Sequence, residues 1–296
     1  WLLGVLFTLP DVASHLVFKG GTSLSKVFGV IDRFSEDIDL CLVPEFVGAD
    51  AAGFDALTSR GKRDAAVMEM QALCSAKAQA VLMPALEEAI ARALGASTTG
   101  GWLRFEVDAD AKSPIVYFAY PSTQGGGFDY LRREVKLELG TLTDQQPTGS
   151  YAIKPLLADA FPQLFEGWSC TVTALELERT FWEKATAAHV YCRQGKLKGE
   201  RYSRHWYDLA AMARSGHAQA AIANSELALA VARHKGMFFA EKDASKNAID
   251  YDAAVSVEIQ IVPEGGSLAA LEKDYAAMLS DGLLATNALS FVEMMN

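Results

Sequence analysis

The sequence lacks the features that mark membrane and secreted proteins. No apolar run reaches the roughly 18–20 residues that a helix needs to cross a bilayer. Residues 1–10 are apolar, but they are too few and lack the basic flank of a signal peptide, so we interpret them as the end of a helix. The sequence begins at Trp1 rather than at methionine, and we expect an N-terminal piece to precede it. The four cysteines lie far apart without a Cys-x-x-Cys pair, which predicts free thiols in a reducing cytoplasm rather than disulfides or a zinc site.

Basic residues are also scarce. Lys and Arg number 27 against 37 Asp and Glu, and the net charge is −10. This balance argues against a protein that coats nucleic acid, although it leaves room for a local basic groove. The chain has no Walker A pattern and no Ser-His-Asp order that would support a hydrolase. It does have 296 residues, of which 50% are hydrophobic, and this is enough for one large or two medium domains.

The most informative stretch covers residues 17–43, which predict a strand, a glycine turn, a short helix, a loop and a second strand. Gly20 and Gly21 break the first strand, and we expect Thr22 or Ser23 to cap the helix that follows. A glycine pair lets the backbone approach a ligand closely, and the N-terminus of a helix offers free N–H groups to a phosphate.

The second strand of this stretch carries Asp37 and Asp39. Side chains alternate between the two faces of a strand, so both carboxylates point the same way. Ile38, Leu40 and Leu42 then point into the core. Two adjacent carboxylates repel each other unless a cation lies between them. A hard divalent cation that also binds substrate phosphates is the usual solution.

These residues carry a resemblance to a known family. Residues 20–23 (Gly-Gly-Thr-Ser), a spacer and residues 35–39 (Ser-x-Asp-x-Asp) resemble the first motif of the nucleotidyltransferase superfamily, and most closely its AbiEii/AbiGii-type toxin family. The resemblance implies a polymerase-β-like fold that holds magnesium, or alternatively manganese, together with a nucleoside triphosphate. It extends over about residues 14–215 and is strongest at four short motifs.

A β-rich block follows the first motif, with strands predicted at residues 102–108, 115–120 and 130–140. In the last of these, Val135, Leu137 and Leu139 alternate with charged residues. Beside the Asp-x-Asp strand, this strand would bring Glu138 towards the metal, as the third acid in the families that the sequence resembles. Glu134 lies on the same face and is the alternative. An exposed, charge-paired face without a catalytic role is the plain structural interpretation.

Residues 175–192 predict a helix with Lys184 in the middle of an apolar stripe. A lysine in such a place is costly unless its ammonium reaches solvent or meets an anion. Glu183-Lys184 matches the third motif of the toxin family, and the resemblance implies that Lys184 reaches the triphosphate. His189, on the next turn, is expected to be an ordinary surface residue.

Arg204 and Asp208 are four residues apart on the next predicted helix and can form an ion pair. The family's fourth motif has the form Arg-Asp-x-x-Asp-Leu, and here His205 replaces its first Asp. Asp208 could hold Lys184 or take part in proton transfer. Residues 193–204 are the one strongly basic run, either a solvated loop or a patch that attracts triphosphate or RNA.

The fold class that we predict is α+β, a nucleotidyltransferase-like mixed β-sheet domain followed by a helical C-terminal half. The expected domains are residues 1–170, the core, and residues 171–296, which would close the active-site cleft. Further helices are expected near residues 218–234 and 267–284, and a strand at residues 255–262. Residues 60–94 predict a long helix that Pro84 kinks or splits. Its inner side is predicted to consist of Met68, Leu73, Val81, Leu82, Leu86 and Ile90.

Taken with the resemblance, the sequence predicts a cytoplasmic, magnesium-dependent nucleotidyltransferase. It would transfer NMP from NTP to RNA, such as the 3′ end of a tRNA, or to a protein hydroxyl, for which Ser35 is one candidate. The implied role is the toxin of a type IV toxin–antitoxin or phage-defence (abortive infection) pair, with a cognate antitoxin as partner. The implied catalytic residues are Asp37, Asp39, Glu138, Lys184 and Asp208, with Asp37, Asp39 and Glu138 as metal ligands. The implied nucleotide-binding residues are Gly20, Gly21, Thr22, Ser23, Lys26, Ser35, Lys184 and Arg204.

Two other functions remain open at this point. A phosphotransferase could use the same site to move the γ-phosphate. A non-catalytic nucleotide-binding regulator could retain the fold without turnover, although the intact Asp37, Asp39 and Lys184 argue against decay.

Overall fold

In the computed structural model, the chain forms two compact units. The residues described are 1–35, 37–95, 101–121, 134–195, 197, 201–285 and 287–296. Unit 1 comprises Trp1–Val27 and Glu36–Leu175, and unit 2 comprises Phe28–Ser35 and Glu176–Asn296. The segment Phe28–Ser35 therefore belongs to unit 2, although its neighbours on both sides in the sequence belong to unit 1. The first domain predicted from the sequence ends where the last strand of unit 1 begins.

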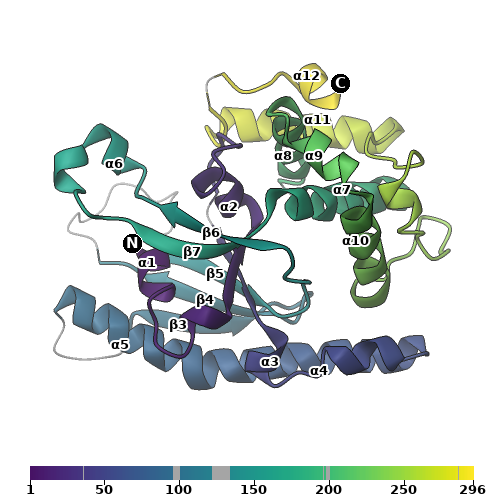
Figure 1. Ribbon diagram of the computed structural model, residues 1–296. Coiled ribbons are helices and arrows are strands. Elements are labelled where there is room, and N and C mark those ends of the chain that lie inside the picture. The colour runs from purple at the N-terminus through teal and green to yellow at the C-terminus, as the bar shows by residue number, and fades with distance from the viewer. Residues whose placement is uncertain (36, 96–100, 122–133, 196, 198–200, 286) are drawn as a thin grey trace. The chain divides into compact units, whose positions relative to one another are not determined.

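Unit 1 is built on a seven-stranded mixed sheet (Figure 1). Its strands lie in the order β3-β4-β5-β2-β1-β7-β6. The β1–β7 and β2–β5 pairs are parallel, and the other neighbours are antiparallel. The strands are β1 (Leu16–Lys19), β2 (Asp37–Leu42), β3 (Leu103–Val107), β4 (Pro114–Ala119), β5 (Glu134–Gly140), β6 (Thr148–Ile153) and β7 (Cys170–Leu175). This mixed sheet, together with the helical unit 2, confirms the α+β class.

Alternation along β2 places its apolar side chains in the core. Ile38, Leu40 and Leu42 are buried, whereas Asp37 and Asp39 are half-buried on the other face. The short helices of unit 1 are α1 (Leu2–Leu6), α2 (Gly20–Lys26), α3 (Pro44–Val47) and α6 (Leu157–Ala160). Helix α2 connects directly to β1 and packs on β1 and β2. The apolar pattern of β2 thus fixes which face of the sheet carries the two aspartates.

A long helical element runs along the sheet (Figure 1). It consists of α4 (Arg60–Lys77), a π-helical turn and α5 (Met83–Leu94), which has Pro84 in its first turn. The element passes through the π-helical turn immediately before this proline and stays helical throughout, so the helix is not split in two. The prediction for Met68 is wrong, because its side chain is 66% exposed. The buried stripe is Met70, Cys74, Ala78, Leu82, Leu86 and Ile90. Met68 precedes this stripe by two residues, which is roughly 200° around the helix and hence the opposite side.

Unit 2 is helical in the part that the structure describes. Its helices are α7 (Leu177–Gln194), α8 (Ser203–Arg214), α9 (His217–Ala223), α10 (Ser225–Phe238), α11 (Gly265–Ser280) and α12 (Phe291–Met295). Helices α8, α9 and α10 pack around α7. The strand predicted at residues 255–262 is wrong. A 3₁₀ turn covers Ala253–Val255, and Val257 beyond it is fully exposed, so apolar alternation there does not reflect a buried strand face. None of the described helices is both long enough and apolar enough to span a membrane.

Candidate active site

The acids predicted from the sequence meet on one face of the sheet in unit 1. Strands β2 and β5 are parallel neighbours, and Asp39 lies beside Glu138 while Asp37 lies beside Lys136. Side chains of residues paired in this way project from the same face of the sheet. Asp37, Asp39, Lys136 and Glu138 therefore form one polar group, which we call the acid face.

The structure separates Glu138 from its alternative, Glu134. Glu134 pairs in register with Ala119 of β4 and precedes the point where β2 begins. Its carboxylate pairs with Arg104 on β3 at 3.3 Å. Glu138 is thus the acid of β5 that lies directly beside the Asp-x-Asp strand. The first residues of the strand predicted at 130–140 lie outside the described residues, and β5 is described from Glu134 onwards.

Lys136 supplies a positive charge to the acid face. Its Nζ forms an ion pair with Oε1 of Glu138. Burial opposes its charge, but Glu138 and then Asp37 outweigh this effect and raise the pKa of Lys136 above its ordinary value. Among the residues that the structure describes, no three His, Cys, Asp or Glu side chains are gathered closely enough to hold a metal ion. The chemistry of the donors nevertheless fits a hard divalent cation, because Asp37, Asp39 and Glu138 present carboxylate oxygens on one face.

Gly20 lies directly against this face. Its φ is +76°, a conformation that favours glycine, and a Cβ built on it would overlap Oδ2 of Asp39 and lie 2.6 Å from Cγ. Any side chain at this position would displace the Asp39 carboxylate. The glycine predicted from the sequence is therefore required by its close approach to a candidate metal ligand as well as by its backbone conformation.

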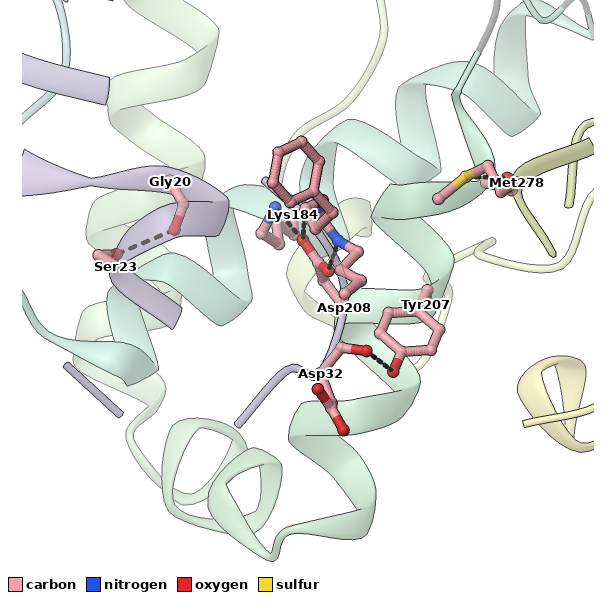
Figure 2. Close-up of polar contacts among 10 residues, drawn as sticks. Gly20, Ser23, Asp32, Lys184, Tyr207, Asp208 and Met278 are labelled. Atoms are coloured by element: carbon pink, nitrogen blue, oxygen red, sulfur yellow. Dashed lines mark hydrogen bonds and ion pairs between the residues drawn. The ribbon is translucent and has the colours of Figure 1, made fainter. Parts of the chain in front are cut away.

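The predicted helix cap is wrong. Helix α2 begins at Gly20, immediately after β1, and Lys19 is its N-cap without a side-chain hydrogen bond. Thr22 and Ser23 consequently lie inside the first turn, where their hydroxyls donate to backbone oxygens. Thr22 Oγ1 donates to the carbonyl of Asp37 and ties α2 to the acid strand. Ser23 Oγ donates to the carbonyl of Gly20 at 2.9 Å, and Ser23 is fully buried (Figure 2). Both side chains hold the glycine turn in place.

Lys26 lies at the other end of α2 from Gly20. It lines a separate cavity of about 380 Å³ with residues of α1 and β7, among them Leu3 and Cys170. Burial lowers the pKa of Lys26. The structure gives no contact between Lys26 and the acid face.

In unit 2 a buried cluster surrounds Asp208. Arg33 Nε donates to Oδ1 of this carboxylate at 2.7 Å, and Arg33 Nη2 donates to Oδ2 at 2.8 Å. Lys184 Nζ lies 2.8 Å from the same Oδ2 (Figure 2). The side-chain exposures are 5% for Arg33, 0% for Asp208 and 12% for Lys184. We call these three residues the Asp208 cluster. The anion that Lys184 requires on its apolar helix is therefore present within unit 2 itself.

The charges of this cluster keep Asp208 ionised. Burial alone raises the pKa of the Asp208 carboxyl, but Lys184 and Arg33 outweigh burial and lower the pKa to about 2. The predicted pair between Arg204 and Asp208 is wrong, because the ion pairs of Asp208 are with Arg33 and Lys184. Spacing along one helix made Arg204 the nearest candidate, but a loop arginine far away in the sequence takes both carboxylate oxygens. Ser35, the last residue of the segment Phe28–Ser35 that carries Arg33, is half-buried.

Two histidines of unit 2 have lowered pKa values for physical reasons. Burial, with Lys184 as the next cause, lowers the pKa of His205 to about 3. His189 is buried rather than on the surface as predicted, and its Nδ1 accepts a hydrogen bond from the backbone N–H of Gln260 at 3.0 Å. Burial lowers its pKa as well. The surface prediction fails because α7 is packed by other helices on several sides. The basic run at 193–204 lies partly outside the described residues.

Arg33 is the residue of the cluster to which the sequence analysis gave no role. The available signal was modest, a single arginine in the loop four residues before Asp37. Nothing in the local spacing connects it with Asp208.

The sheet, the glycine turn and the adjacent acid strands define the class: the protein is a nucleotidyltransferase. The chain belongs to the AbiEii family, because the family model described as "Nucleotidyl transferase AbiEii toxin, Type IV TA system" matches residues 1–295. A similar solved structure is MenT4, a nucleotidyltransferase toxin from Mycobacterium tuberculosis. It has 16% sequence identity and a TM-score of 0.43, with 99% of this chain and 85% of that chain covered. A search of curated proteins gives no match.

Family membership confirms the resemblance drawn from the sequence motifs. It makes the protein a nucleotidyltransferase toxin of the type IV toxin–antitoxin class. It also implies an NTP as substrate and an antitoxin as partner.

Proposed function

We propose that this protein transfers a nucleoside monophosphate from an NTP to an acceptor hydroxyl, with Mg²⁺ bound by Asp37, Asp39 and Glu138. The acceptor is RNA, such as the 3′ end of a tRNA, or a protein hydroxyl. The observation that carries the proposal is the register of β2 and β5, which places Asp39 beside Glu138, with Gly20 against Asp39. The biological role is that of a cytoplasmic toxin in a toxin–antitoxin or phage-defence pair.

The acid face and the glycine turn supply the chemistry at the α-phosphate. Asp37 and Asp39 would hold the cation, which would offset the negative charge of the triphosphate. Glu138 completes the ligand set or accepts the proton of the acceptor hydroxyl. The hydroxyl oxygen attacks the α-phosphorus, the bond to the β-phosphate oxygen breaks, and pyrophosphate leaves. The absence of a side chain at Gly20 allows the phosphates to approach the backbone closely.

In this proposal Lys184 supplies a positive charge to the departing pyrophosphate. A positioned cation lowers the energy of the transition state when negative charge develops on the leaving group. Asp208 holds Lys184 at its Nζ, and Arg204 is a further candidate contact to the nucleotide. Lys184→Met is therefore expected to weaken both NTP binding and transfer about ten- to a hundred-fold, the value of one charge-assisted contact.

The test is to incubate the protein with total RNA, Mg²⁺ and each NTP in turn, labelled at the α-phosphate in one series and at the γ-phosphate in the other. We expect α-label in one class of macromolecule and γ-label in pyrophosphate. Transfer of γ-label to the macromolecule would instead identify a phosphotransferase. Binding of NTP without turnover on any acceptor would identify a regulator.

Site variants tie that activity to the acid face. Asp37→Asn and Asp39→Asn should each abolish transfer and leave the fold intact, because they remove one of two mutually repelling carboxylates. Glu138→Gln should lower turnover strongly with little change in NTP binding, and Glu134→Gln is its matched control on the same strand. If transfer survives both aspartate changes, the assigned site is wrong.

A further inference from the structure

The hydrogen-bond geometry of the Asp208 cluster divides one negative charge between two cations. Arg33 contacts both carboxylate oxygens, and Lys184 shares Oδ2 with Nη2 of Arg33. A bidentate guanidinium–carboxylate pair is geometrically fixed and strong, whereas an ammonium is a compact point charge. Lys184 is therefore the weaker partner, and its charge is only partly compensated by Asp208.

The three side chains of the Asp208 cluster also differ in their exposure to solvent. The Asp208 side chain has no exposed surface and that of Arg33 is 5% exposed, whereas 12% of the Lys184 side chain is exposed. The sealed side of the cluster is thus occupied by the arginine–carboxylate pair. Lys184 is the member of the cluster with the largest exposed fraction of its side chain.

The backbone around Arg33 is anchored on both sides. The Phe34 N–H donates to the carbonyl of Leu283 at 2.8 Å, and the Ala285 N–H donates to the carbonyl of Asp32 at 3.2 Å. The Tyr207 hydroxyl also donates to the carbonyl of Asp32, at 3.4 Å (Figure 2). Because the residues before and after Arg33 are held by main-chain hydrogen bonds, its guanidinium is presented to Asp208 in a fixed direction.

We propose that Arg33 is a positioning residue for nucleotide binding, which holds Asp208 in a bidentate pair and so keeps the Lys184 ammonium available to a phosphate anion. Without Arg33, the full charge of Asp208 would fall on Lys184, and the two would form a closed, buried ion pair. The inference rests on the proposed contact between Lys184 and the triphosphate. It adds a residue that acts through Asp208 rather than by touching the nucleotide.

A purely structural role for Arg33 makes a different prediction. If Arg33 does no more than neutralise a buried carboxylate, its loss lowers stability but leaves the NTP affinity of the folded protein unchanged. Removal of the Asp208 charge in addition would then bring no gain in binding. The two roles therefore predict different NTP affinities for the double variant Arg33→Met/Asp208→Asn. The positioning role predicts tighter binding than in Arg33→Met, and the purely structural role predicts no gain.

The experiment uses the full chain and titrates ATP, GTP, CTP and UTP with Mg²⁺, at a temperature where each variant is shown to be folded. Arg33→Met should weaken binding of the preferred NTP about ten-fold, the value of one charge-assisted contact. Arg33→Met/Asp208→Asn should recover a large part of that loss, because Lys184 no longer faces a full negative charge. Arg33→Lys keeps the positive charge but loses the bidentate guanidinium geometry. Its NTP affinity should lie between those of the wild type and Arg33→Met. Arg92→Met, at an exposed ion pair with Glu88, is the control for loss of an arginine.

The outcomes separate this inference from the proposed function. Wild-type affinity in Arg33→Met, or a double variant that binds no better than Arg33→Met, overturns the positioning role. If Arg33→Met does not fold, Arg33→Lys makes the test, and wild-type NTP affinity in folded Arg33→Lys overturns the positioning role. Wild-type affinity in Lys184→Met overturns the contact between Lys184 and phosphate in the proposed function, whatever Arg33→Met shows.

Discussion

The acid face and the Asp208 cluster both bring carboxylates close to cations, and they differ in their access to solvent. On the acid face, the side chains of Lys136 and Glu138 are 29% and 40% exposed. In the Asp208 cluster, those of Arg33 and Asp208 are 5% and 0% exposed. An exposed pair can exchange one cation for another at little cost, because water solvates the separated charges. A buried pair cannot, because each separated charge would lose both water and partner.

This difference in exposure suggests that the two groups have different roles, although both pair carboxylates with cations. The acid face is suited to release its lysine and to accept a divalent cation together with a substrate. The Asp208 cluster is suited to remain assembled through the catalytic cycle and to hold Lys184. Four predictions test the comparison, from the largest expected effect to the smallest.

Asp208→Asn should lower the free energy of unfolding by about 3–5 kcal/mol, because it leaves two cations of a buried cluster without their carboxylate. Chemical denaturation at neutral pH measures the change. Glu138→Gln on the acid face is the matched control and should change the free energy of unfolding by less than about 1 kcal/mol. Equal losses in the two variants would show that solvent access does not distinguish the groups.

Protonation of Asp208 at low pH should break the ion pairs of the Asp208 cluster. The pKa of Asp208 in the folded protein is about 2, below its ordinary value of 3.8. Its ionised form therefore contributes stability above about pH 4, and this contribution is lost as the pH falls towards 2. The pKa difference corresponds to about 2 kcal/mol. The stability gap between wild type and Asp208→Asn, measured by denaturation from pH 6 to pH 2, should narrow by that amount. A gap that is constant with pH would contradict the assignment.

Gly20→Ala should impair the acid face itself. A non-glycine residue at positive φ costs about 1–2 kcal/mol of stability, and at this position the new methyl group also displaces the carboxylate of Asp39. Gly48→Ala is the matched control, because Gly48 has φ +82° and no neighbouring atom within 4 Å of the added Cβ. Gly20→Ala should lose at least as much stability as Gly48→Ala, because the overlap with Asp39 adds to the backbone cost, and only Gly20→Ala should lose nucleotide transfer. Full transfer in Gly20→Ala would show that the position of Asp39 is not critical.

Lys136→Met should have the smallest effect on stability, below about 1 kcal/mol, because its pair with Glu138 is partly exposed. Thermal denaturation without divalent cations is the measurement. A loss as large as that of Asp208→Asn would mean that Lys136 is a fixed structural counter-ion. The acid face would then not be free to exchange its cation.

Local patterns in the sequence were sufficient for the acid face. Alternation along residues 37–42 gave the direction of both aspartates, and the same alternation in β5 singled out Glu138, with Glu134 as the alternative. Strand register, which no single strand encodes, then places Glu138 rather than Glu134 beside Asp39. The need of Lys184 for an anion also followed from its place on an apolar helix. These conclusions depend on neighbours within a few residues, where periodicity carries the information.

The pair between Asp208 and Lys184 was among the sequence predictions, but the arginine partner of Asp208 could not be predicted in this way. Arg33 lies 175 residues before Asp208 in the sequence, in a loop that has no regular pattern. Its guanidinium nevertheless donates hydrogen bonds to the Asp208 carboxylate. Spacing on one helix instead indicated Arg204. The burial of Ser23 and His189 was missed for a related reason, since each depends on how a whole element packs rather than on the residue's own neighbours in the sequence.

The segment Phe28–Ser35 has a consequence for how this protein can be divided. The chain passes between the two units after Val27, after Ser35 and again after Leu175. A fragment that stops at Leu175 would carry Arg33 without Asp208, and a fragment that starts at Glu176 would carry Asp208 with Lys184 alone. Neither half inherits the complete cluster, so a gene fusion that exchanged one half for that of a relative would also have to exchange an eight-residue insert inside the other. The Asp208 cluster is therefore complete only when Phe28–Ser35 and the rest of unit 2 come from the same protein.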